Sequence, residues 1–391
     1  MPAIIQIKRN NQLDGLRLFA MLGVIFMHLA TVRGGPAGRA IGWGCLQLFM
    51  ALSGFLTTRV LLLDRKQTKA AGGNSWATLG QFFMRRVLRT FPIYYLVIGI
   101  GLLIGLQPAR EVFGWLATYT LNIYLTLTGN WTSLGPYAHL WSLSVQEQFY
   151  LFWALVVMFA PKRRLFQISC AMVAVAPIYR LFAIIHGWGS AALTFFTLSC
   201  LDSVGMGALL ALAADTPKLR DRIDAWLTWG ALPVGLVAAV ILVRLDASLP
   251  SVTGVGFNLA LGLIACWIIH RAKQGFRGPV GWVLESKPAV FLGRLSYGLF
   301  VYHFFMPPIV GPLLRRYGLD FTDGGLAAFV IYSAATIAVA ILSWYLIEAP
   351  LNRLKDRLRP SAAPQPMPLP LSARDAVILR KPIALAGSSA P

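Results

Sequence analysis

The sequence predicts an all-α polytopic membrane protein with about ten transmembrane helices and one further re-entrant or interfacial helix. Of its 391 residues, 57% are hydrophobic and only 13% are charged. Soluble domains carry about 25% charged residues. The mean hydropathy is +0.64. Apolar stretches of roughly 17–25 residues, long enough to cross a hydrocarbon core about 30 Å thick, recur along the whole chain.

The apolar stretches define the spans. We place them at 13–31, 41–62, 90–107, 141–160, 166–186, 193–213, 225–243, 254–270, 289–310 and 325–347. The stretch 112–127 is also apolar, but counting it as a span would put the basic loops around Arg65 and Lys162 on opposite sides. Lys and Arg normally collect in cytoplasmic loops. We therefore predict that 112–127 is re-entrant or interfacial and that both termini are cytoplasmic.

The net charge of +20 does not by itself identify a binding partner, as it could in a soluble protein. A basic excess usually indicates nucleic acid, but cytoplasmic loops explain it here, and we expect no nucleic-acid partner. The cysteines lie inside apolar segments without the spacing of metal ligands, so we predict small core residues and no metal site. They are Cys45, Cys170, Cys200 and Cys266.

The domain organisation is simple. We predict one membrane domain at 1–358, followed by a cytoplasmic tail at 359–391 that is rich in Pro, Ala and Ser and is expected to be disordered. No internal repeat of the kind that marks many transporters is evident.

Three arginines stand at the mouth of the third span. Arg85, Arg86 and Arg89 abut the apolar run, and the first and last share a helix face. A guanidinium is costly to hold in lipid, and its fork matches phosphate. The alternative is ordinary anchoring by positive charge, which does not require three arginines and no lysine. We predict that the three bind the phosphates of an activated donor.

The first span carries Asp14, Arg17 and His28. Eleven helical residues rise about 16 Å, so Arg17 lies near the inner face and His28 beyond the middle of the membrane. An ionisable residue within a span is a candidate functional residue. His28 is either a general base or a hydrogen-bonding partner of a neighbouring helix. Asp14 and Arg17, three residues apart, are spaced to pair.

The fourth span carries a polar cluster. Glu147 lies between Gln146 and Gln148, shortly after Trp141. Such a cluster must face protein or water. Carboxylate and amide groups suit sugar hydroxyls, whereas the alternative is hydrogen bonding between helices. We expect Trp141, Gln146 and Glu147 to line the outer half of the bundle.

The ninth span brings Ser296, Tyr297 and His303 within two turns. Ser296 and His303 are separated by about 10 Å along a helix axis, too far to form a nucleophile pair directly. We include all three among the candidate substrate-binding residues, with structural roles as the alternative.

Six motifs, taken with their order and spacing, resemble those of one family. They are Asp-Gly-Leu-Arg at 14–17 with His28, Leu-Phe-Met-Ala-Leu-Ser-Gly-Phe-Leu at 48–56, Arg-Arg-x-x-Arg-x-x-Pro at 85–92, Trp-Ser-Leu-Ser-Val at 141–145 running into Glu147-Gln148-Phe149-Tyr150, Gly-Arg-Leu-Ser-Tyr-Gly at 293–298 with His303, and Ile-Glu-Ala-Pro-Leu at 347–351. Over roughly residues 12–358 the chain resembles the integral-membrane acyltransferase-3 family, typified by bacterial polysaccharide and lipopolysaccharide O-acetyltransferases. One departure is Gln146, which stands where the family commonly has Glu.

The resemblance implies an activity and a location. The family transfers an acyl group, usually acetyl from acetyl-CoA or another acyl-CoA, to a hydroxyl of a sugar, glycan or glycolipid at the bacterial inner (plasma) membrane. Arg17 and His28 match its Arg-x10-His motif, whose residues are needed for activity, and the three arginines match its arginine motif. Some relatives carry a further esterase-like C-terminal domain, which we do not expect here.

The resulting hypothesis assigns roles to the candidates. His28 acts as general base or carries the acyl group transiently, and both routes stay open. Arg17 orients donor phosphate or stabilises developing negative charge. The rival class is a transporter or flippase for a lipid-linked or acidic substrate, which predicts broken helices and repeat symmetry. The candidate catalytic residues are His28, Arg17 and Glu147, and the candidate substrate-binding residues are Trp141, Gln146, Gln148, Ser296, Tyr297 and His303.

Overall fold

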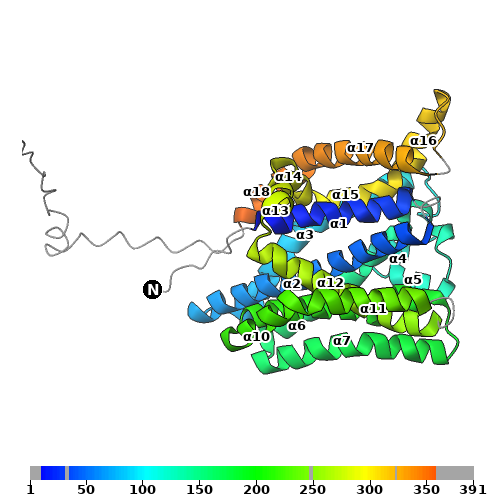
Figure 1. Ribbon diagram of the computed structural model, residues 1–391. Coiled ribbons are helices and arrows are strands. Elements are labelled where there is room, and N and C mark those ends of the chain that lie inside the picture. Colours follow the sequence, from blue (N-terminus) through cyan, green and yellow to red (C-terminus); the bar gives the residue numbers. More distant parts are fainter. Residues whose placement is uncertain (1–9, 31–34, 246–249, 322–323, 358–391) are drawn as a thin grey trace, which may run out of the picture.

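Most of the described part of the chain is helical, and many of the long helices run roughly side by side (Figure 1). The computed structural model describes residues 10–30, 35–245, 250–321 and 324–357. Strands are absent from these residues, so the all-α prediction is confirmed. The predicted tail at 359–391 lies outside them.

Ten crossings account for the bundle. Nine helices in the described ranges are long and apolar enough to span a membrane, and a tenth crossing is a pair of helices bent by 48° at Gly230. The ten crossings are α1 (Asn11–Leu29), α2 (Gly35–Ala70), α3 (Ser75–Leu103), η1 with α6 (Thr132–Leu140, Trp141–Phe159), α7 (Lys162–Ile185), η2 with α9 (Thr197–Cys200, Leu201–Ala214), α10 with α11 (Pro217–Trp229, Ala231–Leu245), α12 (Pro250–Gln274), α15 with η3 and α16 (Ser296–Tyr302, His303–Phe305, Met306–Arg316), and α17 with η4 and α18 (Leu326–Ser343, Trp344–Glu348, Ala349–Arg357). The predicted count of about ten spans is confirmed.

The stretch 112–127 does not cross. It forms two short helices, α4 (Phe113–Ala117) and α5 (Leu121–Thr128), with Tyr119 between them at a left-handed φ of 53°. Neither helix is long enough to span about 30 Å of hydrocarbon. The helix α8 (Ser190–Phe195) is similarly short.

The ninth predicted span, 289–310, has the wrong boundaries. Its first residues belong to a separate helix, α14 (Lys287–Arg294), which follows α13 (Gly278–Glu285). The crossing itself begins at Ser296. Gly293 allows α14 to approach α1 closely, because a Cβ there would lie 1.8 Å from the carbonyl oxygen of Asp14. The chain passes directly over the backbone of α1 at this point and then turns into the bundle.

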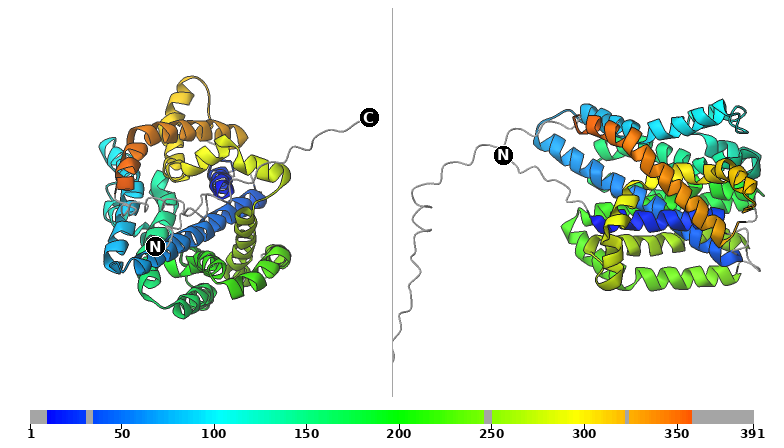
Figure 2. Two further views of the ribbon diagram at one scale, coloured as in Figure 1. Left: turned by 90° about the vertical axis from the view of Figure 1, so that its left-hand side faces the viewer. Right: turned by 90° about the horizontal axis from the view of Figure 1, so that it is seen from above.

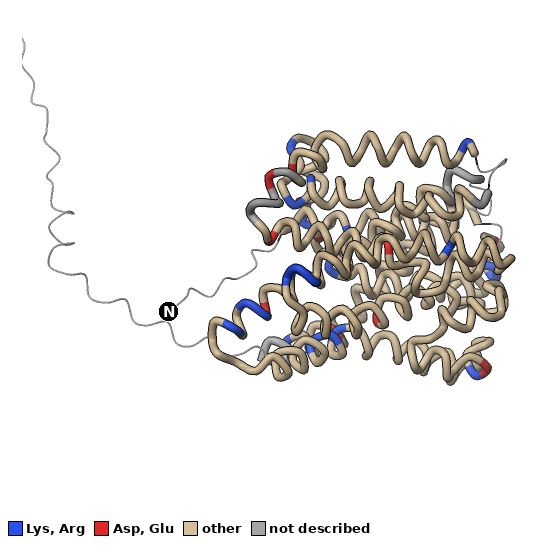
Figure 3. The backbone as a smooth tube through the Cα atoms, turned by 90° about the horizontal axis from the view of Figure 1, so that it is seen from below, with Lys and Arg blue, Asp and Glu red and all other residues tan. Residues whose placement is uncertain are grey.

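The crossings give the bundle two distinct ends. The first described residue, Asn10, and the end of α18 lie at one end, here called the N-terminal face; the opposite end is the far face (Figure 1). Lys and Arg gather toward the N-terminal face (Figure 3). Figure 2 shows α1 end-on, with other helices around it.

Several basic side chains at the N-terminal face are bound to helix ends. Arg65 donates hydrogen bonds of 2.7 Å and 2.6 Å to the carbonyl oxygens of Val157 and Ala160, at the C-terminus of α6. Lys66 and Lys162 both pair with Asp215, the residue after α9. Free carbonyls at a helix C-terminus favour such cations.

Small residues bring the buried helices close together. A Cβ on Gly54 of α2 would lie 2.1 Å from the carbonyl oxygen of Val204 in α9, and one on Gly207 would lie 2.0 Å from that of Ala51. Backbone contact of this kind drives helix association in lipid, where the hydrophobic effect between helices is absent.

Candidate active site

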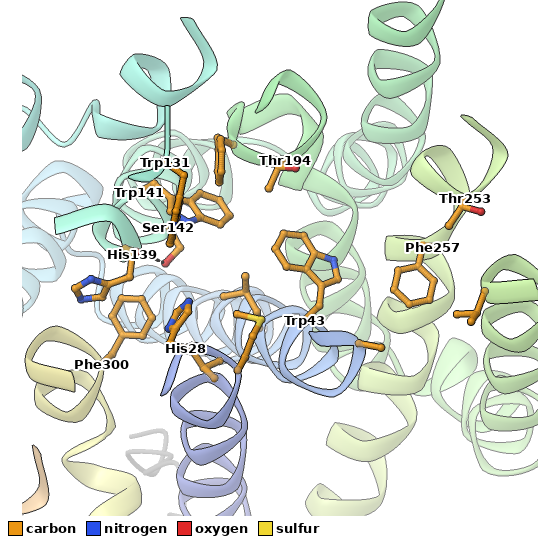
Figure 4. Close-up of a pocket in the computed structure, with 16 residues that line it drawn as sticks. His28, Trp43, Trp131, His139, Trp141, Ser142, Thr194, Thr253, Phe257 and Phe300 are labelled. Atoms are coloured by element: carbon orange, nitrogen blue, oxygen red, sulfur yellow. Dashed lines mark hydrogen bonds between the residues drawn. The ribbon is translucent and has the colours of Figure 1, made fainter. Parts of the chain in front are cut away.

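A cavity of about 860 Å³ lies in the half of the bundle nearer the far face. Figure 4 shows the side chains that line it. Its walls come from the far ends of several helices: His28 is near the end of α1, and Thr253 is near the start of α12. Most of the walls are apolar or aromatic. The cavity is lined by Val24, Met27, His28, Ala40, Trp43, Leu46, Trp131, His139, Trp141, Ser142, Thr194, Phe195, Val243, Thr253, Phe257 and Phe300.

His28 is the candidate catalytic residue that reaches this cavity. Its Nδ1 lies 2.8 Å from Nε2 of His303, and the two rings lie edge to edge in nearly the same plane, with centroids 5.1 Å apart and an angle of 15° between them. The other nitrogen, Nε2, makes no hydrogen bond within the described residues. It is also not among the side-chain atoms that are shielded from solvent without a partner. It is therefore open to the cavity, as a base or nucleophile must be.

Aromatic side chains form the wall beside His28. Trp131 stacks on Phe195 with centroids 5.7 Å apart, and Trp141 meets the same ring edge-on at 5.1 Å. Trp131 also stacks over His28 at 6.2 Å. Flat aromatic faces suit the apolar faces of sugar rings. Trp141 is thus the one predicted substrate-binding residue that lines the cavity.

His139 is a cavity residue that the motif analysis missed. It is 1% exposed, and its ring lies edge-on to His303 at 4.8 Å. Its Nε2 is 3.3 Å from the carbonyl oxygen of Val301. The available signal was the one used for His28, an ionisable side chain in an apolar stretch. His139 stands in η1, just before the predicted start of the fourth span.

Glu147, which we expected in the outer half of the bundle, does not line this cavity. It accepts two hydrogen bonds of 2.8 Å from Arg86, whose guanidinium also stacks 3.3 Å from the centroid of Tyr150. Glu147 and Arg86 line a separate cavity of about 230 Å³. The physical reason is that this crossing begins at Thr132, nine residues earlier than predicted, and therefore carries Glu147 deeper into the bundle.

The two glutamines serve contacts between helices. Gln146 accepts hydrogen bonds from Ser53 at 3.2 Å and from Tyr150 at 3.1 Å. Gln148 donates to Asn122 at 2.9 Å and accepts from Thr197. Gln146 does not line the large cavity. These contacts match the alternative reading of the cluster as hydrogen bonding between helices.

The candidates of the ninth span also lie outside the large cavity. Tyr297 donates 2.8 Å to the carbonyl oxygen of Thr90 and ties α15 to α3. Ser296 is buried, and its Oγ makes no hydrogen bond within the described ranges. His303 is fully buried behind His28.

The three arginines have different surroundings. They lie well inside α3, which begins at Ser75 rather than at the predicted 90. Arg85 pairs with Asp64 at 2.6 Å and Arg86 with Glu147. Arg89 is half-buried and makes no hydrogen bond or ion pair with another described residue.

Arg17 lies in the first turns of α1, about 16 Å from His28 along the helix. It is half-buried and is not part of either cavity lining. Nearby, the Asp14 carboxylate is 3.7 Å from Nε of Arg294. The structure therefore separates the two residues of the Arg-x10-His motif into opposite halves of the bundle. No cluster of His, Cys, Asp or Glu in the described part of the chain is arranged to hold a metal ion.

A buried ion pair that the sequence analysis did not single out supports the cavity wall. Arg180 of α7 donates to Asp202 of α9 at 2.6 Å, and the two side chains are 1% and 0% exposed. Arg180 also donates to the carbonyl oxygens of Ser199 at 2.6 Å and Val255 at 2.9 Å. It thus joins η2 and α12, the elements beside Phe195 and Thr253.

The chain is similar in sequence to proteins named as O-acetyltransferases. The chain is 23% identical over 367 residues to the peptidoglycan O-acetyltransferase OatA of Listeria monocytogenes, covering 87% of this chain and 55% of that protein. It is 24% identical over 374 residues to the O-acetyltransferase OatA of Staphylococcus aureus, covering 87% and 57% respectively. The chain thus spans little more than half the length of these curated relatives. No solved structure matches significantly.

The family model is decisive because it covers most of the chain. A model described as an acyltransferase domain matches residues 10–347, which include every candidate site residue described above. The chain belongs to the acyltransferase-3 family.

Proposed function

We propose that this protein is a membrane O-acyltransferase that moves an acyl group, acetyl in the simplest case, from acyl-CoA to a hydroxyl of a glycan or glycolipid. The observation that carries the proposal is His28, whose Nε2 is open to a cavity of about 860 Å³ while its Nδ1 is held by His303. The family and the two relatives named as O-acetyltransferases support the same chemistry.

The reaction balances with His28 as its base. The acceptor hydroxyl gives its proton to Nε2 of His28 while its oxygen bonds to the carbonyl carbon of the thioester. The carbon–sulfur bond breaks, and the CoA thiolate takes the proton from His28. In the covalent route, Nε2 bonds to the acyl carbon as the carbon–sulfur bond breaks and the CoA thiolate leaves. The acceptor oxygen then bonds to the acyl carbon and displaces the imidazole, and the hydroxyl proton goes to the CoA thiolate.

The acceptor proposal is based on the cavity wall. The rings of Trp131 and Trp141 and the side chains of Ser142 and Thr194 combine stacking surfaces with hydroxyl partners, which fits a sugar better than an all-apolar molecule. One relative is named for peptidoglycan, and a cell-wall or cell-surface glycan is the acceptor class that we propose. The far face would then be the outer side of the bacterial inner membrane.

The donor proposal is based on the arginines near the N-terminal face. Arg89 has no hydrogen-bonding partner within the described residues, so its guanidinium is available to a phosphate. Arg85 and Arg86 are held by Asp64 and Glu147, which fixes them beside it.

The donor must reach His28 from this side. Ser142 lines the large cavity and Glu147 the small one, and the five-residue step from one to the other along the helix rises about 7.5 Å. We propose that the pantetheine arm of acyl-CoA passes from the small cavity into the large one when the donor binds. A cavity that stayed closed with acyl-CoA bound would contradict the direct route.

Replacement of Arg89 tests the donor site. Arg89→Ala should raise KM for acyl-CoA about ten- to a hundred-fold, because one hydrogen bond to a charged group contributes about 1.5–3 kcal/mol. The matched control is Arg163→Ala, which removes the same charge from an exposed position on α7. Radiolabelled acyl-CoA and protein in proteoliposomes give both constants. An unchanged KM in Arg89→Ala would remove Arg89 from the donor site.

The acceptor is tested by mass spectrometry of surface glycans and lipids from cells with and without the gene. We expect the loss of one acyl unit from one glycan class, restored by the wild-type gene but not by a His28→Ala copy. A species that is absent from the outer surface but accumulates unmodified inside would instead favour transport.

A further inference from the structure

His28 at the cavity and His303 behind it form a chain of hydrogen bonds that ends on a backbone carbonyl. His28 Nδ1 is 2.8 Å from His303 Nε2, and His303 Nδ1 is 2.6 Å from the carbonyl oxygen of Phe300. The rings of the two histidines are inclined by only 15°. His28 thus contacts His303 through Nδ1, and His303 contacts His28 through Nε2 and the Phe300 carbonyl through Nδ1.

The carbonyl of Phe300 determines which nitrogen of each histidine carries the hydrogen. The oxygen of Phe300 can only accept a hydrogen bond, so His303 Nδ1 must carry the hydrogen. A neutral imidazole carries one N–H, which leaves His303 Nε2 with a lone pair. His28 Nδ1 must then donate to it. The proton of His28 is thus on Nδ1, and its Nε2 is bare.

The surroundings of the two histidines favour neutral imidazole rings. His303 is fully buried, and neither ring is hydrogen-bonded or ion-paired to a carboxylate anywhere in the ranges that the structure describes. A cation there would lose its hydration without a partner, which is costly. The neighbours are the rings of His139 and Phe304, which pack at 4.8 Å from His303 and 4.9 Å from His28.

The junction of α15 and η3 holds this chain of hydrogen bonds in place. His303 is the first residue of η3, directly after α15 ends at Tyr302. The Phe300 carbonyl that receives its hydrogen bond lies in the last turn of α15. His303 is consequently anchored by its own segment, whereas His28 comes from α1.

We propose that His303 is a positioning residue that fixes His28 in the tautomer with a bare Nε2 facing the cavity. The role of that nitrogen in acyl transfer depends on the function proposed above, but the tautomer does not. His303 was expected to contact substrate, but the geometry places it behind the ring of His28.

The tautomer is read directly from ¹⁵N resonances. The chain has five histidines, so solid-state NMR of ¹⁵N-histidine-labelled protein in lipid bilayers, with a His28→Asn variant for assignment, resolves the two nitrogens of His28. We expect a protonated Nδ1 and a bare Nε2 without any substrate. A protonated Nε2 on His28 in the wild-type protein overturns the proposal.

Two substitutions separate positioning from folding. In His303→Gln, the amide oxygen can accept from His28 Nδ1, so the tautomer and much of the activity should remain. In His303→Met, a side chain of similar length cannot accept comparably, so His28 should populate both tautomers. The kcat of the His303→Met variant should fall about 10- to 100-fold, as for other residues that support a site, with KM for acyl-CoA unchanged.

The two proposals fail in different ways. If the wild type transfers no acyl group but shows the expected ¹⁵N pattern, the proposed function fails and the tautomer stands. If a folded His303→Gln protein loses both the tautomer and activity to the extent that His303→Met does, the positioning role is overturned.

Discussion

His28→Ala should lower the rate of acyl transfer by about 100- to 10,000-fold, which is the range of general acid–base catalysis. The substitution removes the nitrogen that is open to the cavity and leaves His303 without its partner. Acyl transfer from radiolabelled acyl-CoA by protein in proteoliposomes measures the effect.

The control for this prediction is His186→Ala. His186 is exposed near the far face, where its Nδ1 contacts the carbonyl oxygen of Phe182 in its own helix. It should leave transfer unchanged. Comparable expression and thermal stability of both variants would show that the bundle still forms. Near-normal transfer by His28→Ala would exclude His28 from the chemistry.

Asp202→Ala should destabilise the bundle by about 3–5 kcal/mol, the usual effect of leaving one partner of a buried ion pair unpaired. Arg180 would keep its contacts with two carbonyl oxygens but lose the carboxylate that balances its charge. Because those carbonyls belong to η2 and α12, the aromatic wall of the cavity should loosen as well. Thermal unfolding in detergent and the KM for the acceptor measure the two effects.

The double variant Arg180→Met/Asp202→Leu provides the control. It removes both charges and fills the space with apolar side chains, a change that is often neutral or stabilising. We expect it to recover most of the stability lost in Asp202→Ala. If Asp202→Ala is as stable as the wild type, the ion pair does not support this wall.

The spans were the most predictable part of the structure. Apolar length and the positions of Lys and Arg are local properties, and they were sufficient for ten crossings and for the exclusion of 112–127. Boundaries were harder to predict because polar turns of helix continue beyond the apolar runs. The nine residues of η1 before Trp141 moved Glu147 from the outer cavity to Arg86.

The site was predictable only as a set of residue types. The sequence pointed to His28 and Trp141, which reach the cavity. The contacts of His303 with α1, and of Arg180 with Asp202, depend on how helices distant in the sequence pack together. No local spacing encodes such contacts. The arginine cluster was recognised, but the carboxylates that hold Arg85 and Arg86 were not.

The basic residues of the N-terminal face have a second role after the protein is inserted. Their excess predicts which way the chain is oriented, yet Arg65 holds the end of α6, and Lys66 and Lys162 clamp the residue that follows α9. An attempt to invert the topology by neutralising these three side chains would also fray two helix termini. The predicted orientation of the chain and the cohesion of the finished bundle therefore depend on the same cations, and a substitution that tests one should also change the other.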